Sequence, residues 1–572
     1  MLEKINHKSA PKEVVKALVT LYHQGKFDDV LSRSSQLIEE YPQTFVLHNI
    51  IGAISFEKGQ KEVAIEHFRK VIELRPHHPH AYNNIGTVLI DVGEYQEAES
   101  NLKKAIKLQP DYVEAYNNLG NAYKAMEEFN KAIQVYEKAI ELNPQYYEAY
   151  NNLGAVLGKN EQYDEAIEAY NTALSIYPEG FDTYYNMAVT LQDQNKLEKA
   201  IETYKKVLVF KPDHAETYIN MGVVLQGQGK FQEAIEAYNK ALLLKPDFAE
   251  AYNNIGNVFK DQGKLGDAIK SYKKALSFKP DLAETYINMG GALWEQCKME
   301  EAIESYKGTH SIDANNPDAY WYLYGTAQNF VEAKKWIKKC LRADPNHLEA
   351  KLTLSALQYY EGNMSNFNTY MKSKLKENAH MRSFNWVFNL PKLPPLYFHR
   401  WSLFDQMIVM SKKDRPFYEF GVWRGEAFKY LIKTFKKGYG FDTFEGLPED
   451  WHNEKAGTYS SEGNIPKVAG GEFIVGKFED SLPEFFAKKR PMASIINFDA
   501  DLYSSTICAL NFSKPVIDRH TILIFDEFLI NENWEQDEYK ALEEFCNKNH
   551  FTYEVLAISF FSKQVAVRLL GF

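Results

Sequence analysis

Residues 77–110 read HHPHAYNNIGTVLIDVGEYQEAESNLKKAIKLQP, and residues 111–144 repeat the pattern as DYVEAYNNLGNAYKAMEEFNKAIQVYEKAIELNP. The same interval of 34 residues separates a series of asparagines along the chain: Asn84, Asn118, Asn152, Asn186, Asn220, Asn254 and Asn288. A proline column keeps the same step: Pro76, Pro110, Pro144, Pro178, Pro212, Pro246 and Pro280. A strict period of this length indicates stacked structural repeats.

Small residues define the two halves of each repeat. Glycine recurs in the first half at Gly86, Gly120, Gly154, Gly222, Gly256 and Gly290, and alanine in the second at Ala98, Ala132, Ala166, Ala200, Ala234, Ala268 and Ala302. Two helices pack closely only where no large side chain intervenes, and a proline ends the second helix. The pattern therefore predicts antiparallel helix pairs, each of which must stack on the next to bury its apolar face.

These columns resemble the tetratricopeptide repeat over roughly residues 10–345. The resemblance implies an α-solenoid, a superhelix that we expect to occupy residues 1–375 with atypical repeats at both ends. The asparagine series from Asn84 to Asn288 resembles the ladder of the O-GlcNAc transferase superhelix, in which asparagine amides hold a peptide backbone. Two interpretations stand, because an amide can clamp a peptide or serve helix packing. The column before it varies more (Asn83, Asn117, Asn151, Tyr185, Ile219, Asn253, Ile287), so we expect specificity there.

The composition of the chain argues against several classes of protein. The net charge of −11 and the lack of a basic cluster disfavour nucleic-acid binding. The four cysteines show no CxxC spacing, which indicates a reducing, cytoplasmic location rather than a thiolate metal site. No apolar run approaches the roughly 20 residues that span a bilayer, so we expect no membrane span.

After residue 375 the period stops, and residues 376–572 contain short apolar runs with helix-like stretches between them. The runs are residues 417–422, 438–441, 493–498, 521–525 and 565–570. Alternating strands and helices predict an α/β domain, a mostly parallel sheet covered by helices, with ligands at the carboxyl ends of the strands.

Two motifs follow the first two of these strands. The segment EFGVWRGE, residues 419–426, turns through Gly421 and Gly425 into a helix that should begin near Glu426. The segment GFDTFEGLP, residues 440–448, places Asp442 at a strand end, where it could accept hydrogen bonds from two ribose hydroxyls. A glycine turn followed by an acid about 20 residues later is shared by dinucleotide folds and methyltransferases that use S-adenosylmethionine.

Acidic residues gather at the ends of the next two strands. Asp499 and Asp501 end one, and Asp526 and Glu527 end the next. Clustered carboxylates repel one another unless a cation joins them, and oxygen ligands suit Mg²⁺, Mn²⁺ or Ca²⁺. The sequence therefore predicts a divalent metal site, for which Mg²⁺ is the expected ion. The alternative is that these acids only cap strands and loops.

The four motifs GVWRG (421–425), DTFEGLP (442–448), FEDSLP (478–483) and DADLYSST (499–506) resemble, in this order, the macrocin O-methyltransferase family. The resemblance implies a Rossmann-like class I methyltransferase fold that uses S-adenosylmethionine and a divalent metal to methylate sugar hydroxyls. It implies that Glu419, Gly421 and Gly425 hold the methionine part of the cofactor and Asp442 the ribose, with Phe478 and Asp480 near the adenine. Asp499, Asp526 and Glu527 would bind the metal, and Asp501 would be the general base. The family usually has Asp-Asp where this chain has Asp526-Glu527, and a longer second ligand could shift the metal or lower its affinity.

Together these features predict an enzyme that transfers a methyl group to a sugar hydroxyl, with the repeats recruiting a peptide, protein or glycoprotein acceptor. Two alternatives remain. The C-terminal domain could be an inactive part of an interaction scaffold, or it could methylate a protein side chain, a reaction that fits the repeats but needs no metal.

Overall fold

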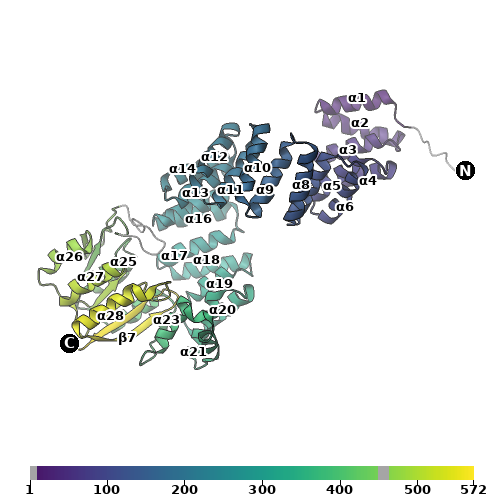
Figure 1. Cartoon of the computed structure of the whole chain (residues 1–572). Helices are drawn as coiled ribbons and strands as arrows, with labels where there is room; N and C mark the ends of the chain where they lie inside the picture. Colours follow the sequence, from purple (N-terminus) through teal and green to yellow (C-terminus); the bar gives the residue numbers. More distant parts are fainter. Residues whose placement is uncertain (1–8, 449–462, 501) are drawn as a thin grey trace. The chain divides into compact units, whose positions relative to one another are not determined.

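The computed structural model describes residues 9–448, 463–500 and 502–572 (Figure 1). These residues group into two compact units, which divide between Pro246 and Asp247.

The first unit consists of helix pairs, as the 34-residue period predicts. Its helices are α1 (Lys12–His23), α2 (Phe27–Glu40), α3 (Phe45–Glu57), α4 (Lys61–Leu74), α5 (Pro79–Asp91), α6 (Tyr95–Leu108), α7 (Val113–Ala125), α8 (Phe129–Leu142), α9 (Tyr147–Lys159), α10 (Tyr163–Ile176), α11 (Phe181–Asp193), α12 (Leu197–Phe210), α13 (Ala215–Gly227) and α14 (Phe231–Leu244). Helix α6 ends two residues before Pro110, so the proline column marks the end of the second helix as predicted.

The glycine column exists because of packing within each pair. A Cβ atom at Gly120 would lie 2.4 Å from the ring of Tyr136, which is fully buried on the second helix. At Gly86 it would lie 2.6 Å from Leu102. The alanines of the second column, such as Ala98 and Ala132, are likewise fully buried. Small residues on one helix therefore make room for large ones on the other.

The second unit begins with further repeats and continues into the α/β part. Its first helices are α15 (Ala249–Asp261), α16 (Leu265–Phe278), α17 (Ala283–Glu295), α18 (Met299–Ile312), α19 (Pro317–Tyr324), α20 (Phe330–Ala343), α21 (Leu348–Tyr360), α22 (Ser365–Met371), η1 (Lys374–Glu377) and α23 (Ala379–Phe388). Helices α19 and α22 have only eight and seven residues, in agreement with atypical repeats at the end of the array.

The α/β part follows without a break in the core. Tyr306 and Trp336 of the repeats belong to the same buried cluster as Phe420 and Phe498 of the sheet. The compact unit therefore spans residue 375, where the sequence pattern changes and where we drew the boundary between the two domains. That boundary stays a prediction.

The strands of the α/β part form one mixed sheet in the order β1-β7-β8-β6-β5-β2-β3-β4. They are β1 (Leu396–Tyr397), β2 (Phe417–Phe420), β3 (Gly438–Asp442), β4 (Gly471–Val475), β5 (Ile495–Phe498), β6 (Ile522–Phe525), β7 (Thr552–Ser559) and β8 (Val565–Leu570). Strand β8 runs antiparallel to β6 and β7, and the other pairs are parallel. The five apolar runs correspond to β2, β3, β5, β6 and β8, so these strands are confirmed, whereas the sequence missed β1, β4 and β7.

Helices cover both faces of this sheet (Figure 1). They are α24 (Arg400–Met410), α25 (Glu426–Phe435), α26 (Phe478–Phe486), α27 (Tyr503–Ser513), η2 (Lys514–Val516), η3 (Trp534–Gln536) and α28 (Glu538–Asn549). Alternate strand residues separate into two clusters, because successive side chains on a strand point to opposite faces. Phe417 packs with α24 and α25, and Phe420 packs with residues of α26, α27 and α28.

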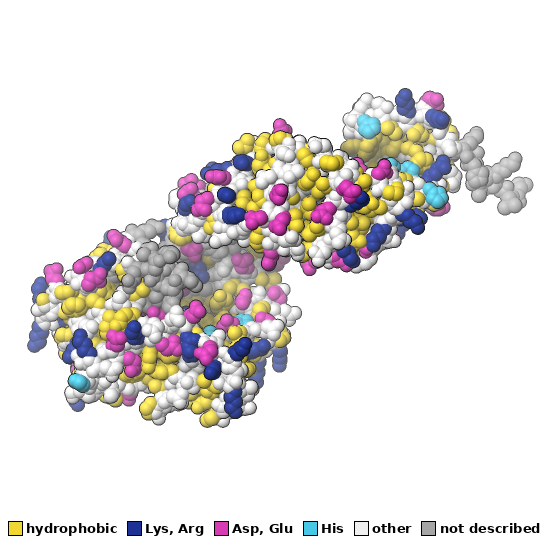
Figure 2. Space-filling model, viewed as in Figure 1, with side chains coloured by type: hydrophobic (Ala, Val, Ile, Leu, Met, Phe, Trp, Pro, Cys, Tyr) yellow, Lys and Arg dark blue, Asp and Glu magenta, His cyan; other side chains and the backbone are white. Residues whose placement is uncertain are grey.

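The surface carries charges of both signs. Figure 2 shows acidic and basic side chains interspersed with hydrophobic ones over the face in view. Within the part of the chain that the structure describes, no helix is long and apolar enough to cross a membrane.

Candidate functional site

The turn between β2 and α25 has an unusual backbone. Gly421, Trp423 and Gly425 have positive φ angles of 84°, 47° and 73°. A Cβ atom at Gly421 would lie 1.8 Å from the carbonyl oxygen of Asp499, so only glycine fits where the ends of β2 and β5 approach each other. Helix α25 then begins at Glu426, as the sequence predicts.

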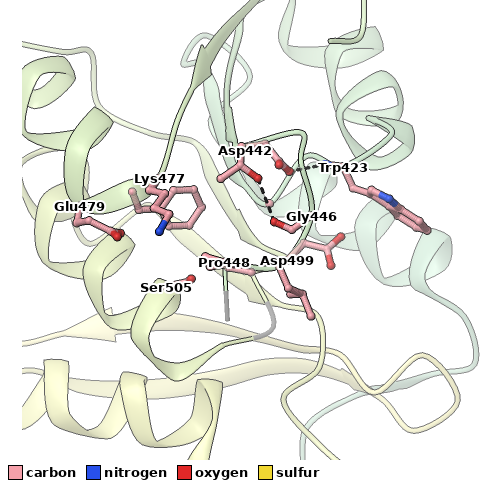
Figure 3. Close-up of a pocket in the computed structure, with 13 residues that line it drawn as sticks. Trp423, Asp442, Gly446, Pro448, Lys477, Glu479, Asp499 and Ser505 are labelled. Carbon is pink, nitrogen blue, oxygen red and sulfur yellow. Dashed lines mark hydrogen bonds between the residues drawn. The ribbon is translucent and has the colours of Figure 1, made fainter. Parts of the chain in front are cut away.

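Asp442, at the end of β3, holds this turn. One carboxylate oxygen accepts a hydrogen bond from the backbone N–H of Trp423 at 2.7 Å (Figure 3). The other accepts from the backbone N–H of Phe444 at 2.6 Å. Burial raises the pKa of the Asp442 carboxyl, although these N–H groups oppose the rise by favouring the charged form. The predicted ribose-binding acid is thus a buried carboxylate that joins the ends of β2 and β3.

A pocket opens beside Asp442, and we call it the strand-end pocket (Figure 3). It is lined by Gly421, Trp423, Asp442, Thr443, Gly446, Leu447, Pro448, Lys477, Phe478, Glu479, Asp499, Ala500 and Ser505. Three of the predicted cofactor residues, Gly421, Asp442 and Phe478, therefore share one cavity. Asp480 is exposed on α26 and does not line this pocket, whereas its neighbours Lys477 and Glu479 do.

A second pocket, which we call the carboxylate pocket, shares Trp423 and Asp499 with the first. Its lining combines two predicted cofactor residues, the three predicted metal ligands and residues of the repeats: Leu265, Trp294, Glu295, Arg400, Trp401, Glu419, Val422, Trp423, Arg424, Gly425, Glu426, Ala427, Asp499, Asp526 and Glu527. Glu419 and Gly425 thus lie in a different pocket from Gly421 and Asp442.

Two of the predicted metal ligands have cationic partners. Arg400 donates to both carboxylate oxygens of Asp526, which also accepts from Gln564. Glu527 accepts from Lys563 at 2.9 Å and from the side chain of Asn531. Burial alone would lower the pKa of Arg400, but the surrounding carboxylates outweigh this effect and raise it.

These ion pairs bear on the predicted metal site. Among the described residues, no group of three or more His, Cys, Asp and Glu side chains is placed to hold a metal ion. Asp499, Asp526 and Glu527 line one pocket, but in this arrangement they do not fit a divalent cation, because Arg400 and Lys563 neutralise two of them. The predicted general base, Asp501, lies outside the described residues. The metal site stays a prediction.

Glu419 is the most deeply buried acid of the carboxylate pocket. Its side chain is 1% exposed, and its Oε2 atom has no hydrogen-bond partner among the described residues. Burial raises its pKa well above the usual value for glutamate, while the charge of Arg400 acts in the opposite direction. A buried carboxyl group with an unpartnered oxygen can form a hydrogen bond with a ligand.

The asparagine ladder forms hydrogen bonds between repeats. In most repeats the ladder amide donates to the preceding column of the preceding repeat, at 2.9 to 3.3 Å: Asn84 to Asn49, Asn118 to Asn83, Asn152 to Asn117, Asn186 to Asn151, Asn220 to Tyr185 and Asn288 to Asn253. Asn254 instead accepts from Asn253, at 3.4 Å. These contacts favour the packing interpretation for the amide N–H groups.

The column in which we expected specificity supplies the acceptors of these bonds. Asn83, Asn117 and Asn253 are only 6 to 7% exposed. In these repeats the column is therefore buried between neighbouring helices. The ladder asparagines themselves are half-buried, and apart from that of Asn254 their side-chain carbonyls remain candidate contacts for a peptide.

Models of tetratricopeptide repeats match residues 47–78, 86–127, 113–146, 145–208, 191–229, 227–263 and 256–296. The chain therefore contains a tetratricopeptide repeat array, an architecture that binds peptides and proteins. A search of curated proteins found no match.

Similar solved structures include YrrB, described as a TPR protein with an unusual peptide-binding site, which is 27% identical. The match covers 33% of this chain and 97% of YrrB, with a TM-score of 0.27. MamA is 26% identical over 29% of this chain and 97% of its own, with a TM-score of 0.27. Yeast Tom70 is 15% identical over 67% of this chain and 98% of its own, with a TM-score of 0.39.

Proposed function

We propose that this protein is a methyltransferase that binds S-adenosylmethionine in the strand-end pocket and methylates a sugar hydroxyl. The repeat array would recruit the protein or glycoprotein that carries the acceptor. The observation that carries the proposal is the position of Asp442, a buried carboxylate beside the glycine turn at the ends of two neighbouring parallel strands.

The topology of the sheet supports a ligand at this place. Strand β2 lies between β5 and β3, so the chain order reverses between β2 and β5. In open α/β sheets, ligands bind at such a switch point, outside the carboxyl ends of the strands. The strand-end pocket is lined by residues at the carboxyl ends of these strands: Gly421 directly after β2, Asp442 at the end of β3 and Asp499 directly after β5.

The chemistry of the lining residues supports this choice of cofactor. Asp442 would accept hydrogen bonds from the ribose hydroxyls through its carboxylate oxygens. Phe478 and Ala500 provide apolar surface for the adenine. When bound, S-adenosylmethionine supplies an electrophilic methyl group.

The acceptor would lie in the carboxylate pocket, which adjoins the strand-end pocket at Trp423 and Asp499. Carboxylates there can orient a hydroxyl by accepting its hydrogen bond, and Asp501 is the proposed general base. No step of this mechanism is assigned to a metal, because Asp526 and Glu527 are paired with Arg400 and Lys563.

Isothermal calorimetry with S-adenosylmethionine tests the proposal. Asp442→Ala should weaken binding by roughly 10- to 100-fold, because removing an acceptor of two charged hydrogen bonds costs about 1 to 3 kcal/mol. Asp414→Ala is the control, since it removes an exposed aspartate in the loop before β2. The proposal fails if the parent protein does not bind the cofactor, or if Asp442→Ala binds it as tightly as the parent does.

A further inference from the structure

One wall of the carboxylate pocket comes from the repeat array. Leu265 begins α16, and Trp294 and Glu295 end α17, yet all three line the same cavity as Glu419 and Asp499 of the α/β part. These helices belong to the last repeats that follow the 34-residue period.

Several contacts within this unit hold the wall in place. The indole N–H of Trp401, on α24, donates to the carbonyl oxygen of Trp294 at 3.4 Å. Cys297 and Met299, just after α17, pack against the hydrophobic cluster that includes Trp401. Arg424, in the glycine turn, donates to the carbonyl oxygens of Lys260 and Asp261 at the end of α15. The repeat helices and the α/β part therefore form the cavity together.

The pocket contains polar groups that have no hydrogen-bond partner, or only a distant charged one, among the described residues. The indole N–H of Trp294 is buried and has no hydrogen-bond partner among the described residues. The Glu295 carboxylate lies 3.9 Å from the Lys260 ammonium, beyond hydrogen-bond distance. Glu419 adds a nearly fully buried carboxylate with an unpaired oxygen. A buried donor such as the Trp294 indole and a buried acceptor such as Glu419 Oε2 are costly without partners unless a ligand meets them.

The chemistry of the lining selects among ligands. Asp526 and Glu527 are paired with Arg400 and Lys563, and the remaining acids of the lining still outnumber Arg424, so the pocket disfavours an anionic ligand. Carboxylates accept hydrogen bonds from hydroxyls, the indole N–H can donate to a hydroxyl oxygen, and an indole face offers apolar surface to the C–H groups of a ring. A neutral, polyhydroxylated ring satisfies all three kinds of group.

We propose that Trp294 and Glu295 determine acceptor specificity, forming a repeat-borne wall against which an uncharged sugar ring binds. This inference rests on the proposed function for the identity of the reaction. It adds that the repeats contribute to the acceptor site itself, in addition to recruiting the molecule that carries the acceptor.

The test measures sugar binding separately from cofactor binding. Saturation-transfer NMR would be recorded on the full chain with S-adenosylhomocysteine and methyl glycosides of glucose, galactose, mannose, rhamnose and N-acetylglucosamine. At least one glycoside should bind, and Trp294→Ala and Glu295→Gln should each weaken it about tenfold. Glu284→Gln is the matched control, because Glu284 is exposed in the first turn of the same helix.

The outcomes separate the two proposals. Calorimetry on each variant should show the same affinity for S-adenosylmethionine as the parent, and a parent that does not bind this cofactor refutes the proposed function alone. The repeat-borne wall is refuted if no glycoside binds the parent, or if the bound glycoside is held equally by both variants and the parent. Glu295→Gln keeps the side-chain shape. If Trp294→Ala does not fold, the glycoside affinity of Glu295→Gln alone tests the repeat-borne wall.

Discussion

The inter-repeat bond of Asn118 offers a quantitative test of what the asparagine ladder does. Its side-chain N–H group donates to Asn83 at 2.9 Å and to the Thr87 hydroxyl at 3.1 Å. Because Asn83 is 7% exposed, Asn118→Ala leaves a buried carbonyl oxygen without this donor. This loss costs about 1 to 3 kcal/mol, and alanine returns up to about 0.7 kcal/mol of helix propensity. We expect a net destabilisation of about 0.3 to 2.3 kcal/mol.

Native-state hydrogen exchange of the full chain, followed by mass spectrometry, measures this locally. Backbone amides of α5 and α7 should exchange faster by roughly fivefold for each kcal/mol lost. Asn101→Ala is the control, since the half-buried Asn101 donates to the backbone carbonyl of Glu97 within its own helix, at 2.8 Å, and makes no bond between repeats within the described part of the chain. In Asn83→Ala/Asn118→Ala, which removes both partners, the loss should be smaller than the sum of the two single losses.

The packing interpretation is refuted if Asn118→Ala exchanges no faster than Asn101→Ala. The amide would then be free for a peptide, as in the clamp hypothesis. Faster exchange in α5 and α7 would show that the ladder N–H groups serve packing, so that only the ladder carbonyls could contact a peptide.

Two further predictions concern the α/β part. Burial lowers the pKa of His399 to about 4, so its contribution to the free energy of unfolding is fully present above the unfolded pKa of about 6.5 and is lost as the pH falls from there toward 4. In urea unfolding, His399→Asn, which can still cap α24, should therefore lose about 2 kcal/mol less stability than the parent between pH 7 and pH 5. An equal loss in both proteins would contradict this assignment. Arg400→Met removes the cation paired with Asp526, so Mn²⁺ should bind about tenfold or more tightly in electron paramagnetic resonance titrations. An unchanged affinity would mean that Arg400 does not compete with a metal.

The sequence predicted the repeats well because each one depends on local columns that recur. The position of Gly120 opposite Tyr136 is repeated from copy to copy, so the period alone reveals the helix pair. The partner of each ladder asparagine was not predictable in the same way. It lies 35 residues earlier, as Asn83 does for Asn118, and only the stacking of successive repeats brings the two side chains together.

The α/β part shows the same limit. Strands β2, β5 and β6 are buried on both faces and appear as continuous apolar runs, whereas β4 is half-exposed and β1 has two residues, so neither stands out. Arg400 lies just after β1, in a stretch with no recognisable motif, and its partner Asp526 is 126 residues away. The pairing that alters the predicted metal site is thus a tertiary contact without a sequence signal.

Trp294 departs from the pattern of its repeat column, and the sequence alone could have shown this. At the same position of earlier repeats stand Ile90, Lys124, Gly158, Gln192, Gln226 and Lys260. A tryptophan in a column that otherwise holds aliphatic, small or polar residues indicates a role specific to its own repeat. In the structure that role is the wall of the carboxylate pocket.

The link between the glycine turn and the repeats has a consequence for catalysis. In the sequence, Arg424 lies between Trp423 and Gly425. The backbone N–H of Trp423 donates to the Asp442 carboxylate, and Gly425 directly precedes α25. Its guanidinium donates to carbonyls at the carboxyl end of α15, where a helix dipole favours positive charge. The conformation of the proposed cofactor turn therefore depends on a repeat helix. Because the repeats also share the buried core of the α/β part, removing them would expose that core and release the turn, so the last repeats are part of the proposed catalytic unit.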